Sequence, residues 1–136
     1  GKIRDKKFFQ KLMHKFTIVD ETSKCFFNNR WGSLDALSKF GNTVVSHQMH
    51  NELNYSHFEV LYLGLPLIHN SPRLENLGYY YPDFNVEMGA KQLKAAIENH
   101  ESTKDLYKKD ALDFLKKYNP CDKSNIKNYM RLLRDA

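Results

Sequence analysis

Residues 43–71 read TVVSHQMHNELNYSHFEVLYLGLPLIHNS, in which a helical pattern lies between two short apolar strand patterns. Thr43–His47 contains the β-branched residues typical of a buried strand. Glu52–Leu63 has helical periodicity and ends at Gly64, and Leu65–His69 is a second short apolar strand. Neighbouring parallel strands need a crossover, which is usually a helix. This segment therefore predicts an α/β fold with a parallel sheet.

The segments before residue 43 add helical and strand patterns. Apolar residues recur at helical spacing over Ile3–Phe16, with lysine and arginine at the other positions, so we expect a basic amphipathic helix. Two β-rich runs follow, at Thr17–Asp20 and Cys25–Asn28. Ser33 then caps a helix that stops at Gly41.

After a turn-rich segment, Asn70–Phe84, the chain is predicted to be helical to its end. The periodicity indicates three helices, at Met88–His100, Thr103–Tyr118 and Ser124–Arg134. The expected fold is a Rossmann-like parallel sheet flanked by helices, with a helical C-terminal third.

Length and composition indicate one folded domain. The chain has 136 residues, 41% hydrophobic and 27% charged, which fits a single soluble domain over residues 1–136. The longest apolar run, Val60–Ile68, is far shorter than the ~20 residues of a membrane-spanning helix, so no membrane span is expected. Cys25 and Cys121 belong to no paired-cysteine motif, which favours a reducing, cytoplasmic setting. Gly1 in place of methionine suggests a tag remnant or an excised fragment, and we expect the chain to be a fragment of a longer protein.

Polar residues follow both predicted strands. His47 and Gln48 come after the first strand, and His69, Asn70 and Ser71 end the second. In open parallel sheets, ligands bind in the crevice beyond the carboxyl ends of the strands. We therefore expect these five side chains to lie in one crevice.

The predicted helix between the strands offers a site for a diphosphate. Asn51 is a good N-cap, which would leave the N–H groups of Glu52, Leu53 and Asn54 pointing outward at the positive end of the helix dipole. Phosphate groups bind well at such a helix start.

A carboxylate lies further along the same helix. Glu52, Tyr55 and Glu59 share one stripe, with Glu59 about 10 Å from Glu52 along the axis. The Glu59 carboxylate could accept hydrogen bonds from the two ribose hydroxyls. A phosphate site at the helix start and a carboxylate about 10 Å further along therefore fit an extended nucleotide sugar. The plain structural alternative is that Asn51 only caps the helix and that Glu59 is a solvated helical residue.

The run FEVLYLGLPLI at Phe58–Ile68 is similar to the signature of retaining GT-B glycosyltransferases, in which a helical glutamate precedes a Gly-x-Pro turn and an apolar strand. Together with residues 45–48, 53–55, 64–72 and 78–84, it more closely resembles a poorly characterised glycosyltransferase-like family of bacteria, phages and large DNA viruses. The resemblance covers about residues 16–134. It implies one half of a GT-B fold, the C-terminal domain that binds the nucleotide-sugar donor. The partner would be the acceptor-binding N-terminal domain of the same chain, which is absent here.

The resemblance also implies roles for residues. Glu59 would hold the donor ribose, and Asn51 would replace the first glutamate that many of these enzymes have. That replacement leaves open whether transfer retains or inverts the sugar configuration. The predicted donor-binding residues are Gln48, Glu52, Leu53, Asn54, Tyr55, Glu59, His69, Asn70 and Ser71.

Three residues are candidates for catalysis, namely His47 and Asn51 near the sugar and Arg30 beside the leaving diphosphate. In GT-B enzymes the protein binds no metal, and a helix dipole and basic side chains stabilise the diphosphate. The resemblance therefore implies neither a metal nor a cofactor. The nucleotide-diphosphate sugar is the substrate, and this domain alone is not expected to be active.

Two features have alternative interpretations. His47, His50, His57 and His69 suggest a metal site, but their spacing matches no standard zinc pattern. Tyr79–Tyr81 would either stack on a base or sugar, or pack a loop onto the core.

Two other functions remain open. A net charge of +5, the basic helix at Lys2–Lys15 and the C-terminal lysines fit a nucleic-acid-binding module. The chain has no recognised DNA- or RNA-binding motif, so nucleic acid is not the expected partner. The other is a non-catalytic scaffold that exposes Phe8, Phe9 and Leu12 to a partner domain.

Overall fold

The computed structural model describes residues 7–14, 32–51 and 54–135, which fall into two units, residues 1–32 and 33–136. In the first unit, helix α1 (Lys7–Met13) confirms the central part of the predicted basic helix, and Phe8 in it is 77% exposed. The β-rich runs at Thr17–Asp20 and Cys25–Asn28 lie outside the described residues.

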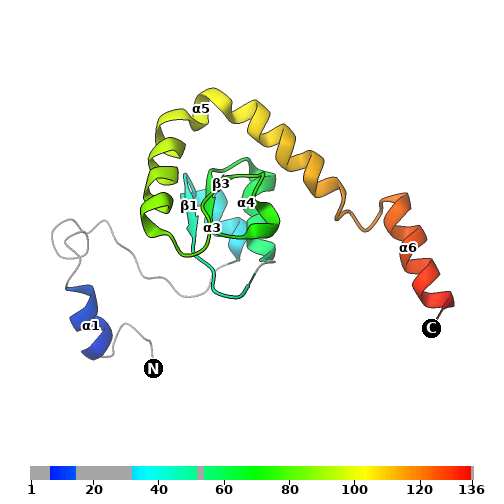
Figure 1. Cartoon of the computed structure of the whole chain (residues 1–136), viewed down its shortest axis with the longest axis horizontal. Helices are drawn as coiled ribbons and strands as arrows, with labels where there is room; N and C mark the ends of the chain where they lie inside the picture. The colour runs from blue at the N-terminus through cyan, green and yellow to red at the C-terminus, as the bar shows by residue number, and fades with distance from the viewer. Residues whose placement is uncertain (1–6, 15–31, 52–53, 136) are drawn as a thin grey trace. The chain divides into compact units, whose positions relative to one another are not determined.

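The second unit is a small parallel sheet among helices (Figure 1). Within the described residues the sheet has three strands in the order β1-β2-β3, and both pairings are parallel. The predicted α/β class with a parallel sheet is therefore confirmed, although most of the unit is helical. Its elements are α3 (Ser33–Phe40), β1 (Val44–Ser46), α4 (Tyr55–Leu63), β2 (Leu67–His69), the 3₁₀ turn η2 (Pro72–Leu74), β3 (Tyr79–Tyr80), α5 (Val86–Lys116) and α6 (Lys123–Arg134).

The turn from α4 to β2 depends on Gly64. This residue has φ 70°, a left-handed conformation that glycine adopts without a steric penalty. The N–H of Leu65 then bonds the carbonyl of Val60 at 3.1 Å and closes the end of α4. The predicted helix end at Gly64 is confirmed.

The central strand β2 is buried on both faces. Leu67 and Ile68 point to opposite sides of the sheet, because side chains alternate along a strand, and both are 0% exposed. The edge strand β1 differs, since its Val45 is 59% exposed. The expectation that Thr43–His47 forms a buried strand is therefore wrong for this side chain, because β1 is an edge strand of the sheet that the described residues form.

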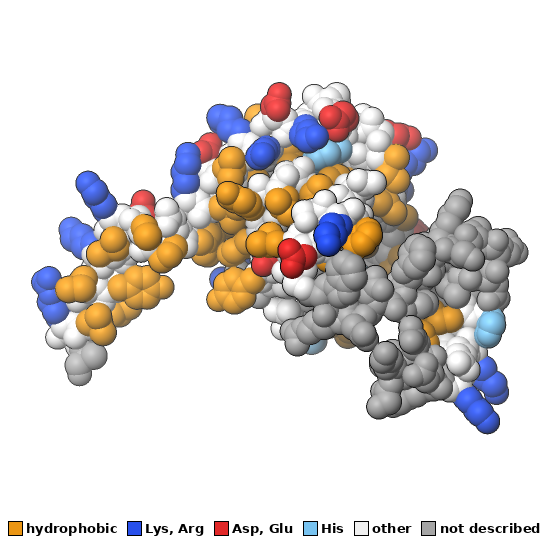
Figure 2. Space-filling model, turned by 180° about the vertical axis from the view of Figure 1, so that it is seen from behind, with side chains coloured by type: hydrophobic (Ala, Val, Ile, Leu, Met, Phe, Trp, Pro, Cys, Tyr) orange, Lys and Arg blue, Asp and Glu red, His pale blue; other side chains and the backbone are white. Residues whose placement is uncertain are grey.

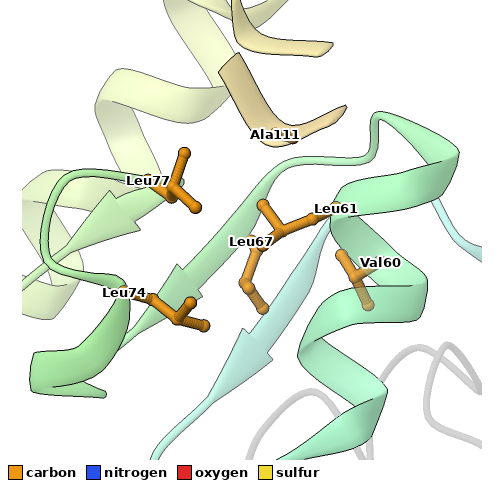
Figure 3. Close-up of a cluster of buried hydrophobic side chains, with 6 residues drawn as sticks. All are labelled: Val60, Leu61, Leu67, Leu74, Leu77 and Ala111. Atoms are coloured by element: carbon orange, nitrogen blue, oxygen red, sulfur yellow. The ribbon is translucent and has the colours of Figure 1, made fainter. Parts of the chain in front are cut away.

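A compact apolar cluster lies on the Leu67 face of the sheet. Figure 3 shows leucines from β2, α4 and the connection to β3 pointing toward one another, with Ala111 of α5 above them. Partly buried side chains of α3 and α5, including Leu37 and Phe114, pack against it. Burial of such side chains stabilises the fold by roughly 1.5–3 kcal/mol each. The cluster consists of Val60, Leu61, Leu67, Leu74, Leu77 and Ala111.

Helix α5 covers both faces of β2. Met88, Leu93 and Ala96 in its first half pack with Ile68, whereas Ala111 in its second half packs in the cluster around Leu67. Figure 1 shows that the helix changes direction near its middle. This bend allows one helix to reach both sides of a strand.

The prediction of two helices between Met88 and Tyr118 is wrong, because α5 is continuous over Val86–Lys116. Ser102 and Thr103 do not interrupt it, since their hydroxyl groups donate to the carbonyl of Asn99 at 2.8 and 3.1 Å. Such bonds keep serine and threonine inside a helix and often bend it. Helix α6 agrees with the third predicted helix to within one residue.

Strand β3 was not predicted. Gly78 leads into it with φ 65°, and a Cβ atom there would lie 2.8 Å from the carbonyl oxygen of Leu67. Tyr79 and Tyr80 form the strand, and Tyr81 is buried beside Ile68. These tyrosines therefore pack on the sheet, as one of the two interpretations of this cluster predicted.

None of the helices within the described ranges combines the length and the apolar character needed to cross a membrane.

Candidate functional site

Asn70 fixes the crevice at the carboxyl ends of β1 and β2. Its Oδ1 accepts the backbone N–H of Gln48 at 2.8 Å, and its Nδ2 donates to the carbonyl of Gln48 at 2.9 Å. The same Nδ2 donates to the carbonyl of Asp83 at 2.7 Å. One buried amide therefore holds the loop after β1 against the turn that follows β3.

A chain of amide and hydroxyl groups continues from Gln48. Asn51 Nδ2 donates to Gln48 Oε1 at 3.2 Å, and Gln48 Nε2 donates to Ser46 Oγ at 2.8 Å. Ser46 Oγ also shares a hydrogen bond of 2.8 Å with His57 Nε2 of α4. These bonds connect the edge of the crevice to the buried face of α4.

The crevice encloses a cavity of about 190 Å³. Four of its eight lining residues carry neutral amide or hydroxyl groups, and Pro72 and Phe84 supply apolar surface. Two lining residues, His50 and Asp83, have φ 53°, a left-handed conformation that is uncommon outside glycine and tends to occur at functional sites. The lining residues are Gln48, His50, Asn51, Asn70, Ser71, Pro72, Asp83 and Phe84.

Two buried histidines lie beneath this crevice, with ring centroids 5.7 Å apart. His69 Nε2 donates to the carbonyl of Leu77 at 2.8 Å, and its Nδ1 accepts the N–H of Ser71 at 3.2 Å, so the ring is a neutral tautomer. Burial lowers the pKa of His69. Burial, reinforced by the neighbouring His69, lowers the pKa of His57 to about 4. Both rings are therefore neutral near pH 7.

His57 Nδ1 is buried without a hydrogen-bond partner among the described residues. An unsatisfied buried ring nitrogen of this kind lowers the free energy of unfolding by about 1–3 kcal/mol. The described residues contain no group of three or more His, Cys, Asp or Glu side chains placed to hold a metal ion.

His47 lies beside a second, apolar cavity of about 310 Å³. Its Nδ1 shares a hydrogen bond of 2.7 Å with the hydroxyl of Tyr81, and its ring stacks on Tyr81 at 5.9 Å and lies 5.4 Å from Phe84. Burial raises the pKa of Tyr81, so the phenol stays protonated. The residues around this cavity are Val45, His47, Ile68, Tyr81, Val86, Gly89, Ala90 and Leu93.

The start of α4 differs from the prediction. The N-cap is Asn54, whose Oδ1 accepts the N–H of Ser56 at 3.0 Å, so the predicted cap at Asn51 is wrong. Asn51 instead bonds Gln48 and lines the crevice. The carbonyl of Asn54 accepts the N–H of His57, so part of the helix start is already paired. At this helix start the N–H groups of Ser56 and His57 therefore already have partners.

The structure brings together four of the predicted site residues, Gln48, Asn51, Asn70 and Ser71, in the cavity lining. Others lie elsewhere: Tyr55 is 74% exposed on α4, Glu59 is half-buried one turn further along, and His69 is buried beneath the crevice. Arg30, Glu52 and Leu53 lie outside the described residues.

Sequence analysis missed four lining residues, His50, Pro72, Asp83 and Phe84. Pro82-Asp83 does carry a turn signal, since proline followed by aspartate is typical of turns. The pairing of this turn with Asn70 joins positions 13 residues apart, and local sequence patterns do not report such contacts.

The nucleic-acid alternative uses the C-terminal lysines, and both it and the scaffold alternative depend on the first helix. Its described part, α1, has no buried residue and exposes Phe8. Both alternatives stay predictions.

Comparison with known proteins gives one match. The family model described as a protein of unknown function (DUF2827) matches residues 2–133. No curated protein matches the chain, and neither does any solved structure. Because the matching region covers nearly the whole sequence, the chain belongs to the DUF2827 family.

Proposed function

We propose that this chain is the donor-binding domain of a glycosyltransferase and that its crevice binds the sugar and diphosphate of a nucleotide-sugar donor. One observation supports the proposal above the others. Side chains from the carboxyl ends of two adjacent parallel strands, Gln48 from β1 and Asn70 and Ser71 from β2, line one cavity. This is the place where open parallel sheets bind their ligands.

The chemistry of the cavity suits a sugar. Sugar hydroxyls donate and accept hydrogen bonds, and the amides of Gln48 and Asn51 and the hydroxyl of Ser71 offer both. Phe84 adds an apolar surface of the kind that packs against a sugar ring. A glycosyl group therefore finds complementary partners without a metal.

The diphosphate and the ribose are assigned to α4. Asn51 in the cavity is only three residues before the Asn54 cap, so the positive end of the helix dipole lies within about 10 Å of the lining. Glu59 follows Tyr55 by four residues, about 6 Å along the helix axis. By helical periodicity Glu59 lies on the side of α4 away from the buried Val60 and Leu61, where a ligand can reach it. The proposed Rossmann-like half of a GT-B fold places the ribose there.

The proposal is tested by titration of the folded chain with nucleoside diphosphates and nucleotide sugars, followed by backbone amide NMR shifts and calorimetry. We expect shifts at Gln48, Asn51, Asn70 and Ser71 and along Asn54–Glu59, with one base preferred. Loss of a hydrogen bond from a charged group costs about 1.5–3 kcal/mol, so Glu59→Ala is expected to weaken binding roughly 10- to 100-fold.

The matched control is Glu98→Ala, which removes the same charge from an exposed position on α5. Circular dichroism establishes that both variants are folded. Equal donor affinity in Glu59→Ala and in Glu98→Ala would contradict the ribose assignment, and the absence of shifts with every nucleotide would contradict the donor-binding function.

A further inference from the structure

Helix α6 carries a concentrated positive charge. Its sequence, KSNIKNYMRLLR, contains four basic residues and no acidic residue. At about 100° per residue, these four fall in one row within an arc of about 80°. The row consists of Lys123, Lys127, Arg131 and Arg134.

The neighbouring face of α6 is apolar and exposed. Ile126, Met130 and Leu133 follow one another at helical spacing and are 48%, 47% and 75% exposed, and α6 contributes no buried residue. Tyr129 and Leu132 extend this face and are 63% and 61% exposed. Figure 2 shows the hydrophobic side chains of α6 gathered on one side of the helix, with lysine and arginine side chains along the other.

The start of α6 is well fixed. Asp122 caps it by accepting the N–H of Ser124 at 2.8 Å, and the hydroxyl of Ser124 bonds the same carboxylate. These bonds lower the pKa of Asp122, which therefore remains charged at neutral pH. Asn125 Nδ2 donates to the carbonyls of Lys117 and Asn119 at 2.8 and 2.9 Å, which ties α6 to the end of α5. All of these bonds that hold the start of α6 come from the chain itself.

We infer that α6 binds the surface of an anionic lipid bilayer, with the apolar face in the interface and the basic row against the headgroups. A short helix with a basic flank and an apolar face has the pattern of such interfacial helices. Its 12 residues span about 18 Å, too short to cross a hydrocarbon core of about 30 Å, so it lies along the surface. The inference does not depend on the proposed donor site.

The charges favour a bilayer over a second copy of α6. Two α6 helices packed by their apolar faces would bring two rows of four basic residues close together, and each helix has acidic residues only at its two caps, Asp122 and Asp135. A stable dimer also needs about 800 Å² of buried surface on each partner, which is more than one face of a 12-residue helix supplies. An anionic lipid surface neutralises the basic row and buries the apolar face at the same time.

The test is co-sedimentation of the full chain with phosphatidylcholine vesicles, with and without phosphatidylserine. We expect binding only with phosphatidylserine, and weaker binding at high salt because screening reduces the attraction. Each basic residue near such a surface adds about 1 kcal/mol, so Lys127→Gln with Arg131→Gln is expected to reduce binding roughly 30-fold. Ile126→Asn with Leu133→Asn should abolish it.

The matched control is Lys94→Gln with Lys104→Gln, which removes two charges from exposed positions on α5 and should leave binding unchanged. Circular dichroism establishes that each variant is folded. Glu59→Ala should bind vesicles normally, so failure of the donor site and failure of this inference are distinguishable. Absence of vesicle binding, or binding that is the same with and without phosphatidylserine, would overturn the inference. A dimer in solution that Leu133→Asn converts to a monomer would also overturn it, since a second copy would then cover this face.

Discussion

The two ends of the parallel sheet are built from different kinds of residue. At the amino end, Leu67 lies in the apolar cluster, and the hydroxyl of Tyr107 donates to the carbonyl of Leu65 and accepts the N–H of Leu67. At the carboxyl end, Asn70 and Ser71 bond polar partners and line a cavity. The difference indicates that apolar packing, and with it stability, is concentrated at the amino end, whereas the carboxyl end holds hydrogen-bonded polar groups around a cavity.

The largest effect is expected at Leu67, which is 0% exposed at the centre of the cluster (Figure 3). Leu67→Ala removes three carbons and leaves a cavity, so the free energy of unfolding should fall by about 2–5 kcal/mol. Denaturant unfolding followed by circular dichroism measures it. The control is Val45→Ala on β1. Val45 is 59% exposed, so this substitution should lower the free energy of unfolding by less than about 1 kcal/mol. Similar losses in the two variants would show that stability is spread evenly over the sheet.

The two buried histidines, His57 and His69, lie near the carboxyl end of the sheet. They should make the free energy of unfolding depend on pH. The pKa of His57 falls from 6.5 in the unfolded chain to about 4 in the folded protein, so the unfolded chain takes up the proton first as the pH falls. The free energy of unfolding should therefore decrease between pH 6.5 and about pH 4, by about 3 kcal/mol in total. The lowered pKa of His69 acts in the same direction.

Denaturant unfolding at a series of pH values tests this. The interval from about pH 6.5 to 5 is most informative, because carboxylates titrate mainly below it. His57→Gln should flatten the pH dependence, because it removes the buried ring whose pKa is lowered. Unfolding that is independent of pH in this interval would contradict the buried, neutral state of both rings.

A smaller loss is expected for Tyr107→Phe at the amino end. The N–H of Leu67 and the carbonyl of Leu65 would each lose a partner, which costs about 1–3 kcal/mol in the free energy of unfolding. Burial raises the pKa of Tyr107 to about 12, so the lost phenol is neutral over the working pH range. Tyr62→Phe is the control, since Tyr62 is 61% exposed on α4 and should change stability by less than about 0.5 kcal/mol. Equal effects of the two substitutions would show that the Tyr107 bonds do not hold α5 to the sheet.

Local patterns predicted the strand-helix-strand unit well, because periodicity and glycine positions act over a few residues. Gly64 ends α4 as expected, and Gln48 and Asn70 meet at the strand ends. What could not be predicted depends on distant contacts. The two halves of α5 resemble separate helices in the sequence because each packs on a different face of β2.

The same reasoning explains the missed part of the candidate site. Strand β3 has only two residues, too few for an alternating pattern, and its pairing with β2 determines where the turn at Asp83 lies. The left-handed conformations of His50 and Asp83 have only a weak signal in the sequence, since neither residue is glycine. The bond from Asn70 to Asp83 then completes the cavity.

The smallest change in the free energy of unfolding is expected at the N-cap of α4. The sequence pattern predicts Asn51 as this cap, whereas the structure has Asn54. The Oδ1 of Asn54 accepts the N–H and the hydroxyl of Ser56, so Asn54→Ala should lower the free energy of unfolding by about 1 kcal/mol. Asn51 is exposed and bonds only the side chain of Gln48 among the described contacts, so Asn51→Ala should cost less than about 0.5 kcal/mol. The two variants carry the same chemical change, three residues apart, and denaturant unfolding separates them. If Asn51→Ala were the more destabilising, the helix would begin where the sequence pattern predicted, and the free N–H groups for a diphosphate would lie at Glu52–Asn54. If Asn54→Ala is the more destabilising, α4 begins at Asn54, and under the proposed function the diphosphate would bind at this shorter helix start and leave Asn51 free to contact the sugar.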